Sequence, residues 1–163
     1  MDQPKFLVTD ESARLARWIR LMGFDAALMP AQPLAALYRR AVNEQRVVVT
    51  RNGRVKPGTL VRAIVLARQD LAEQLRQLVR ELRLPIEEAW MFSRCDRCNC
   101  EVEPVEKAQV KDRVPPYVFQ TQERFHRCPS CGRIYWAATH WQRAQRFFAQ
   151  VRKEAGHAEQ GLQ

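Results

Sequence analysis

The sequence predicts an α/β protein in which a parallel sheet flanked by helices is followed by a small separate module and a C-terminal helix. Over residues 5–82, short apolar runs alternate with amphipathic helical stretches, and short connections join them. This alternation is typical of a parallel sheet covered by helices. Beyond that region, four of the five cysteines form two C-x-x-C pairs, and large apolar residues are sparse. The second part is therefore expected to depend on its cysteines for much of its stability.

Four apolar runs predict the strands of the sheet. The first covers residues 5–9 and is followed directly by Asp10, and the second covers residues 26–29. The clearest strand is 46–50, because it contains three consecutive β-branched valines. A fourth run covers residues 61–67. Ligands bind at the carboxyl ends of the strands in such sheets, so Asp10 is a candidate site residue.

Three stretches with helical periodicity predict the helices. Residues 12–22 have one apolar face that includes Trp18, which is assigned to the core. Gly23 is predicted to end this helix. A second helix covers residues 33–42 and begins at a proline, which is tolerated in the first turn. A third covers residues 70–82 and carries a row of leucines.

The two cysteine pairs, Cys95 with Cys98 and Cys128 with Cys131, are separated by 29 residues. Zinc takes four ligands at tetrahedral corners, and a two-residue gap lets one tight turn direct two thiolates at the same ion. The spacing therefore predicts a structural Zn²⁺ site, with these four cysteines as ligands, in a small zinc ribbon. Cys100 is predicted to be a spare thiol, because four ligands already close the site.

Alternatives remain open for this module. The four cysteines could instead form two disulfides, although the odd cysteine count and the lack of a secretory signal peptide favour a metal site. His126 and His140 are alternative zinc ligands. Gly132 follows the last cysteine and is expected to adopt a positive φ, which lets backbone N–H groups turn toward the sulfurs.

The chain is basic throughout. Its 163 residues include 27 Lys and Arg against 18 Asp and Glu, a net charge of +9. Residues 1–90 carry 15 basic and 10 acidic side chains, and residues 91–163 carry 12 and 8. A nucleic acid that runs across both parts would account for this balance, and an arginine-rich solvated surface is the alternative. No apolar run approaches the roughly 18 residues of a membrane span, so we expect a cytoplasmic protein with no membrane partner.

The predicted organisation has two domains and a tail. The sheet domain covers residues 1–90, and the zinc ribbon with the C-terminal helix covers residues 91–151. Within the ribbon, a short strand is predicted over residues 133–136. The C-terminal helix is predicted to end at Val151, and the polar residues 152–163 are expected to form a disordered tail.

Several stretches of this sequence carry a family pattern. In the first domain they are F-L-V-T-D-E-S-A-R-L-A-R-W-I-R-L-M-G at residues 6–23 and V-V-V-T-R-N at residues 47–52. In the ribbon they are S-R-C-D-R-C-N at 93–99, D-R-V-P-P-Y-V at 112–118 and C-P-S-C-G-R-I-Y-W at 128–136, followed by His140 and Trp141. Together these residues resemble the PIN-like RNase family with a C-terminal zinc ribbon, named after the C-terminal domain of the Mut-seven exonuclease.

This resemblance implies a PIN-like fold and a metal-dependent ribonuclease in which clustered carboxylates at the strand ends hold Mg²⁺ or Mn²⁺. Such ions generate a water-derived nucleophile and stabilise the charge on the scissile phosphate. Asp10 matches the first aspartate of the family. The second position falls in residues 30–33, which contain no acid, and the third is Asn52. The implied catalytic site of Asp10, Glu11 and Asn52 therefore lacks two anionic ligands and is degenerate.

Each residue of this degenerate site has a second interpretation. Asp10 is either a metal ligand or the N-cap of the helix that begins near Ser12. Asn52 is either a degenerate ligand or a turn residue that accepts positive φ easily. Glu11 adds a carboxylate beside Asp10, although neighbouring residues on an extended segment point in opposite directions.

Four arginines are candidate nucleic-acid contacts: Arg14, Arg17, Arg20 and Arg51. The first three are spaced by three residues and form a helical stripe that could meet phosphates; a solvated helix face is the alternative. Aromatic residues near the ribbon serve either as its core or as platforms for base stacking. They are Tyr117, Phe125, Tyr135, Trp136 and Trp141.

Three functions are compatible with these features. The leading hypothesis is an RNA-binding protein of this RNase family, with weak or absent nuclease activity and a purely structural zinc. The second is an active Mg²⁺- or Mn²⁺-dependent single-stranded RNA endoribonuclease that recruits Glu11, Asp25 or another acid. The third is a zinc-ribbon interaction module for a protein or ribonucleoprotein partner.

Overall fold

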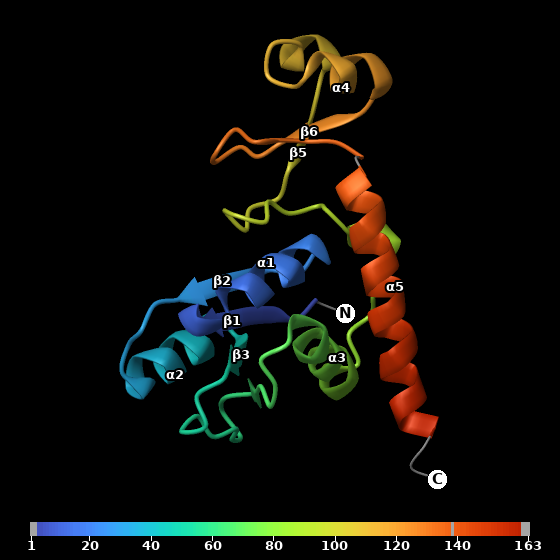
Figure 1. Cartoon of the computed structure of the whole chain (residues 1–163). Helices are drawn as coiled ribbons and strands as arrows, with labels where there is room; N and C mark the ends of the chain where they lie inside the picture. Colours follow the sequence, from blue (N-terminus) through green and yellow to red (C-terminus); the bar gives the residue numbers. More distant parts are fainter. Residues whose placement is uncertain (1–2, 138, 161–163) are drawn as a thin grey trace.

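The computed structural model describes residues 3–137 and 139–160; the side chains of residues 139–140 and 157–160 lie outside that description. Figure 1 shows a larger lobe built on a parallel sheet and a smaller lobe built on an antiparallel sheet. A long helix, α5 (Thr139–Gln160), runs from the smaller lobe along the larger one.

The larger lobe contains a four-stranded parallel sheet in the order β2-β1-β3-β4. Its strands are β1 (Lys5–Thr9), β2 (Ala26–Met29), β3 (Arg46–Thr50) and β4 (Ala63–Val65). The predicted bounds of the first three strands are confirmed, and β4 occupies only the middle of the run 61–67. Val8 lies opposite Leu28 of β2 and Val49 of β3. The carboxyl ends of these three strands therefore lie at one edge of the sheet.

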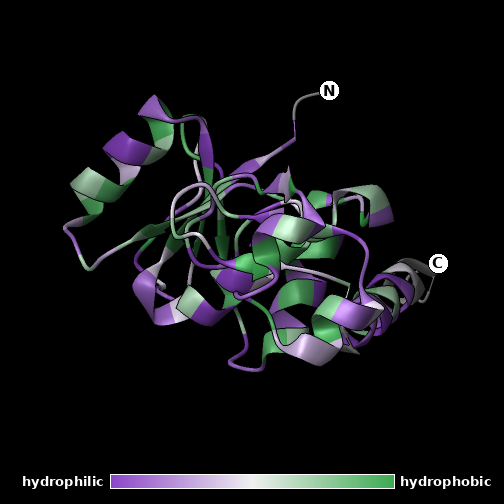
Figure 2. Ribbon diagram, turned by 90° about the horizontal axis from the view of Figure 1, so that it is seen from above, coloured by the Kyte–Doolittle hydropathy of each residue, from purple (hydrophilic) through white to green (hydrophobic). Residues whose placement is uncertain are grey.

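Helices cover both faces of this sheet. The helices α1 (Ala13–Leu21) and α3 (Leu71–Leu82), together with α5, pack on the face that contains Phe6 and Val8. The helix α2 (Leu34–Asn43) packs on the other face, with Leu7 and Val48. The split arises because successive side chains of a strand point to opposite faces. Figure 2 shows hydrophobic ribbon where the layers meet, and the predicted α/β class is confirmed.

Helix α1 ends at Leu21, and Gly23 follows just past its C-cap as the predicted stop. This glycine has a φ of 98°, and the N–H of the next residue, Phe24, bonds to the carbonyl of Ile19 at 3.2 Å. A Cβ atom at Gly23 would clash with the backbone carbonyl of Trp90. Only glycine therefore lets the segment before the smaller lobe pass so close to the end of α1.

The C-terminal helix completes the core of the larger lobe. Phe148 and Val151 are fully buried against α1 and α3, and Trp18 packs edge-on against Phe148 with ring centroids 5.5 Å apart. The core assignment of Trp18 is therefore confirmed. The helix was predicted to end at Val151 but continues to Gln160, and its main contacts are with α3 of the larger lobe. Residues 161–163 of the predicted tail lie outside the described part of the chain.

The smaller lobe has a three-stranded antiparallel sheet in the order β5-β6-β7. Its elements are β5 (Glu103–Val105), α4 (Pro116–Thr121), β6 (Phe125–Arg127) and β7 (Ile134–Tyr135), with 3₁₀ turns at η2 (Glu88–Trp90) before it and η3 (Lys107–Val110) within it. Only β7 was predicted. The buried core contains just Val110, Val114 and Phe125, so Phe125 is a core residue. A core this small leaves room for a large contribution from the cysteine cluster.

Candidate functional site

Asp10 and Glu11 follow β1 in a short 3₁₀ turn and face different strand ends. The Asp10 carboxylate accepts a hydrogen bond from the N–H of Ala31, 3.2 Å away, beyond the end of β2. The Glu11 carboxylate turns toward β3, where it accepts from the Thr50 hydroxyl at 2.9 Å and the Arg51 N–H at 3.0 Å. The two carboxylates are therefore hydrogen-bonded toward the ends of different strands.

Glu11 is engaged by protein donors. Its Oε1 atom also accepts from the Thr9 hydroxyl at 2.5 Å, so three donors share one oxygen. Burial acts to raise the pKa of Glu11, but the hydrogen bonds from Thr9, Arg51 and Thr50 outweigh burial and hold that pKa below its usual value. Glu11 is therefore a structural carboxylate that ties the ends of β1 and β3 together.

Asn52 lies in the turn that follows β3. Its Oδ1 atom accepts a hydrogen bond from the N–H of Arg54 at 3.0 Å, and its own N–H donates to the Thr50 hydroxyl at 3.0 Å. These contacts favour the turn interpretation over a metal ligand. Asn52 is not among the described residues with a positive φ.

The N-cap interpretation of Asp10 is also wrong, because no side chain caps the first turn of α1. Asp25, the other acid proposed for the site, precedes β2 at the opposite edge of the sheet and pairs with Arg46 at 2.6 Å. In the described part of the chain, the four cysteines are the one group of three or more metal-binding side chains that converges. Among the described residues, no group of three or more carboxylates converges at the carboxyl edge of the sheet.

The four cysteines do converge. The sulfur atoms of Cys95, Cys98, Cys128 and Cys131 all lie within 4.8 Å of one another, and those of Cys95 and Cys131 are 3.8 Å apart. A tetrahedral site with zinc–sulfur bonds of about 2.3 Å requires sulfurs about 3.8 Å apart. The donor set and spacing therefore fit a structural metal such as zinc.

Each cysteine pair forms a tight turn around its first sulfur. In each, the N–H of the second cysteine donates to the sulfur of the first, at 3.3 and 3.4 Å. The residue that follows each pair has a positive φ, 68° at Asn99 and 71° at Gly132. The expectation for Gly132 is confirmed, and asparagine takes the equivalent position in the first turn.

Cys95 is activated by its surroundings. Burial acts to raise the pKa of this thiol, but hydrogen bonds from the Tyr135 hydroxyl, 3.0 Å away, and from the N–H groups of Cys98 and Arg97 lower the pKa to about 7. The thiolate is the form that binds a metal, so these hydrogen bonds favour Cys95 as a ligand. At Cys98 a hydrogen bond with Ser130 acts to lower the pKa, but those with Cys131 and Cys95 raise it to about 12.

Cys100 lies beside the cluster but outside the four-cysteine group. Its sulfur is 3.2 Å from that of Cys128, whereas the converging set contains only the four residues predicted from spacing. This arrangement supports its assignment as a spare thiol. His126 lines a groove between the lobes, and the side chain of His140 lies outside the described residues.

The first cysteine turn is fastened to α1 and β2. Arg20 is 4% exposed, and it donates to the carbonyl of Ala26 and to those of Asp96 and Arg97, each at 2.9 Å. The prediction that Arg20 meets phosphates is therefore wrong, because its guanidinium is buried and bonded to backbone. Arg17 is more exposed and pairs with the Asp96 carboxylate at 2.7 Å.

The other two predicted nucleic-acid contacts lie on the surface. Arg14 is exposed at the rim of the groove between the lobes. Arg51 is exposed at the carboxyl edge of the sheet, where its N–H bonds to Glu11. Both remain candidates for phosphate contact.

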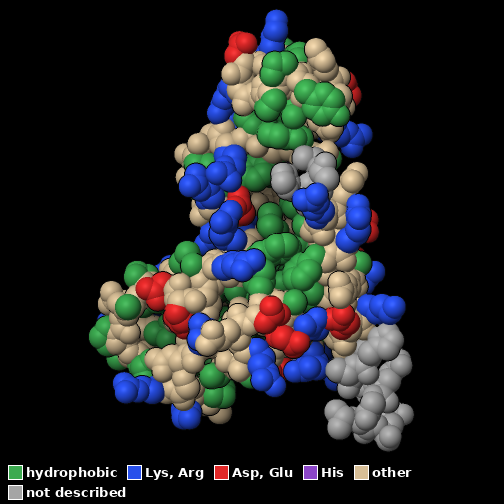
Figure 3. Space-filling view, viewed as in Figure 1, with side chains coloured by type: hydrophobic (Ala, Val, Ile, Leu, Met, Phe, Trp, Pro, Cys, Tyr) green, Lys and Arg blue, Asp and Glu red, His purple; other side chains and the backbone are tan. Residues whose placement is uncertain are grey.

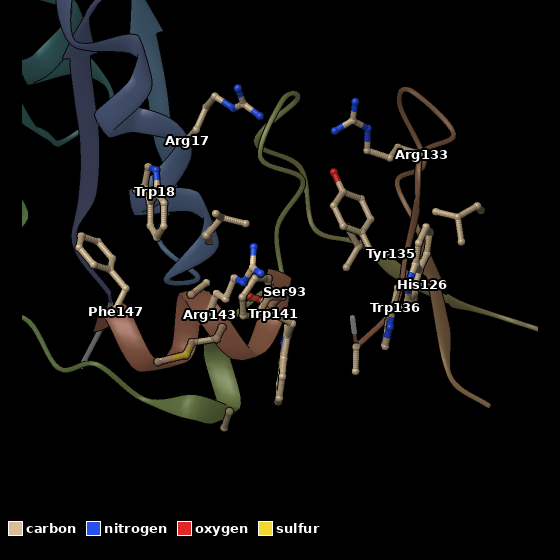
Figure 4. Close-up of a pocket in the computed structure, with 18 of the residues that line it drawn as sticks. Arg17, Trp18, Ser93, His126, Arg133, Tyr135, Trp136, Trp141, Arg143 and Phe147 are labelled. Atoms are coloured by element: carbon tan, nitrogen blue, oxygen red, sulfur yellow. The ribbon is translucent and has the colours of Figure 1, made fainter. Parts of the chain in front are cut away.

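A groove of about 1600 Å³ separates the lobes. In Figure 3, hydrophobic side chains line the hollow below the upper lobe, and Lys and Arg side chains lie along its rims. Figure 4 shows Trp18 and Phe147 at one end of this space, Trp141 near its middle, and Tyr135 and Trp136 on the ribbon wall. Its arginines are Arg14, Arg17, Arg124, Arg133 and Arg143. The sequence indicates aromatic and basic residues near the ribbon. It does not indicate that these residues line one groove together with residues of α1 and α5.

The fold and the cysteine site define an α/β domain with an appended four-cysteine module. A family model described as the Mut7-C RNAse domain matches residues 4–148, and the chain belongs to this family. Comparison with curated proteins and with solved structures returned no match. Among the described helices, none combines the length and apolarity needed to cross a bilayer.

Proposed function

We propose that this protein binds single-stranded RNA and that its metal-dependent nuclease activity is weak or absent. The proposal combines membership of an RNase family with a net charge of +9 that is spread over both lobes. A basic surface provides the sequence-independent part of RNA affinity, and that part needs no divalent ion. The metal of the cysteine site, zinc by its donor set, serves structure only.

One observation supports weak or absent nuclease activity: among the described residues, no three carboxylates converge near the carboxyl edge. Asp10 is alone beside the end of β2, and Oε1 of Glu11 is occupied by three donors. Asn52 brings an uncharged amide that is already used in a turn. A hard divalent cation needs several anionic oxygen ligands, so Mg²⁺ or Mn²⁺ would bind here only weakly.

The five cysteines form no disulfide with one another. Free thiols in a four-cysteine cluster suit a reducing compartment, which supports our expectation of a cytoplasmic location.

The test compares cleavage and binding on the same RNA. Purified protein is incubated with labelled single-stranded RNA in Mn²⁺ or Mg²⁺, beside an Asp10→Ala variant, and binding is measured separately in buffer without Mn²⁺, Mg²⁺ or chelator, so that the metal of the cysteine site stays bound. We expect RNA binding without added Mn²⁺ or Mg²⁺ for both proteins and no metal-dependent cleavage above that of the variant. Robust cleavage that Asp10→Ala abolishes would establish the active endoribonuclease instead.

A further inference from the structure

We propose that the groove between the lobes is the binding site for single-stranded RNA, with bases stacked on Trp136 and Trp141 and phosphates on Arg124 and Arg143. This inference rests on the proposed function and adds the site, which is separate from the degenerate carboxyl edge. Figure 4 shows the two tryptophans around the same space, one from α5 and one from the segment after β7.

The aromatic side chains of the groove keep part of their surface in contact with solvent. Trp136 and Trp141 are only half-buried, and Trp141 packs at a tilt on Phe92 with ring centroids 5.6 Å apart. Trp136 packs against the core of the smaller lobe but is less buried than the core ring Phe125, which is 2% exposed. An accessible tryptophan face stacks on a nucleobase of any identity, which is how proteins hold single strands without sequence preference.

The charge of the groove suits a phosphate backbone. Five arginines line it, and Asp70 is the one carboxylate among the lining residues. That carboxylate caps α3, because it accepts the N–H of Glu73 at 3.1 Å. Asp96 lies beneath and pairs with Arg17 at 2.7 Å and with Arg133 at 3.6 Å, so the cations still outnumber the anions.

Three of these arginines form no ion pair in the described part of the chain. Arg14, Arg124 and Arg143 are exposed, and no ion pair is found for them within residues 3–137 and 139–156. They come from α1, from the segment before β6 and from α5, so they border the groove on separate elements. An arginine without a partner carboxylate can contact a phosphate without first giving up an ion pair.

The size of the groove favours a polymer over a small molecule. Its volume of about 1600 Å³ exceeds the range of about 300–1,000 Å³ typical of small-ligand sites. Because it is open and combines aromatic faces with cations, it suits an extended single strand whose bases are free to stack. A duplex keeps its bases stacked on one another and offers no free base faces to the tryptophans.

The first experiment measures the affinity of the full chain, with its metal bound, for a short fluorescent single-stranded RNA in EDTA-free buffer. The groove variant is Arg124→Glu with Arg143→Glu, and the matched control is Arg39→Glu with Arg62→Glu. All four side chains are exposed and the change in charge is the same, but neither control residue lines the groove. We expect the groove variant to bind at least about tenfold more weakly than the control.

The second measurement tests base stacking in the unmodified protein and so does not depend on any variant folding. RNA that contains 4-thiouridine is photocrosslinked to the protein, and the linked peptides are identified by mass spectrometry. We expect links within residues 134–147. A strand of the same length without bases, and the matching duplex, should each compete at least about tenfold less well than the single strand.

The outcomes distinguish an error in the proposed function from an error in the proposed site. If the unmodified protein binds no RNA, both the proposed function and this site are wrong. If it binds RNA, but the groove and control variants are equally affected and the links fall elsewhere, only the site is wrong. If polyglutamate displaces the RNA as effectively as unlabelled RNA does, the groove accepts acidic chains in general and the assignment of RNA is overturned.

Discussion

The side-chain amide of Asn99 donates a hydrogen bond to the Asp25 carboxylate, 2.7 Å away, and its oxygen accepts the N–H of Ala26 at 2.9 Å. Asn99 directly follows the first cysteine pair, and Asp25 directly precedes β2. The metal site of one lobe is therefore fastened to the sheet of the other through one side chain. Asp25 also pairs with Arg46 at the start of β3, so the contact extends across two strands.

We first predict energetic coupling between Asn99 and Asp25. Asn99→Gly keeps the positive φ and removes both side-chain bonds, and we expect it to lower the free energy of unfolding by about 1–2 kcal/mol. Asp25→Asn should cost a similar amount, because Arg46 retains Glu44 as a partner. Urea denaturation of both single variants and the double variant would give a coupling of at least about 0.5 kcal/mol. Strictly additive effects would contradict the contact.

The pH dependence of stability provides a second prediction. Burial acts to raise the pKa of Asp25, but hydrogen bonds from Arg46 and Asn99 outweigh burial and lower it. A carboxyl whose pKa is lower in the folded state stabilises the protein above its unfolded pKa of about 4, and this stabilisation is lost as the pH falls through the folded pKa. The stability difference between the unmodified protein and Asp25→Asn should therefore shrink from pH 7 toward pH 3, as measured by urea denaturation. A constant difference would refute the assignment.

The metal site yields a third prediction, which separates Cys98 from Cys100. Cys98→Ser removes one of the four converging sulfurs, so zinc affinity should fall by at least about 100-fold, as judged by competition with a chromogenic chelator. Cys100→Ser is the matched control and should retain one zinc per chain. If Cys100→Ser lost the metal and Cys98→Ser kept it, the ligand set would have to include Cys100, whose sulfur is 3.2 Å from that of Cys128.

Restoring the missing anions should restore a cation site. Ala31 is exposed and its N–H bonds to Asp10, so Ala31→Asp with Asn52→Asp adds two carboxylates at the carboxyl edge. We expect Mn²⁺ affinity to rise at least about tenfold, measured by electron paramagnetic resonance of free Mn²⁺. Ala35→Asp with Asn43→Asp places the same charges on exposed positions of α2 and should leave the affinity unchanged. Tight Mn²⁺ binding by the unmodified protein would contradict the depleted site.

Two adjacent phenylalanines of α5 should have opposite roles. Phe148 is fully buried, so Phe148→Ala should lower the free energy of unfolding by about 3–5 kcal/mol. Phe147 is half-buried and lines the groove, so Phe147→Ala should cost about 1–2 kcal/mol in stability. Phe147→Ala should also weaken RNA binding severalfold, as measured by fluorescence anisotropy. Equal stability losses in urea denaturation would show that both rings belong to the core.

Much of the fold could be predicted because the local sequence pattern of a segment and its environment in the folded protein favour the same secondary structure. The valines of β3 favour a strand and are buried in one, and Gly23 both ends α1 and allows a close backbone approach. The strands β5 and β6 were missed because their residues are few and mostly polar or exposed. The strands β5 and β6 lie between the two cysteine turns, and the cluster holds these turns together. No local sequence period indicates that the two strands pair.

The candidate site was also predicted where local spacing is sufficient and missed where distant segments meet. C-x-x-C spacing predicts four converging sulfurs, because a tight turn can aim two of them at one point and the structure needs only to bring two turns together. The arginine stripe of α1 was only partly misjudged, because Arg14 is exposed and the other two arginines contact the first cysteine turn. Arg20 is buried beneath the first cysteine turn, and Arg17 is paired with Asp96.

The α/β alternation, the first three strands, the four converging cysteines and the scarcity of acids near the strand ends could all be predicted from the chain. These properties are local, set by side-chain type and by spacing within a few residues. The partners of Asp10 and Glu11 at different strand ends, the place of α5 in the core of the sheet lobe and the groove between the lobes could be seen only in the folded protein. Each of these depends on contacts between segments far apart in the chain, whose relative placement follows from packing of the whole molecule.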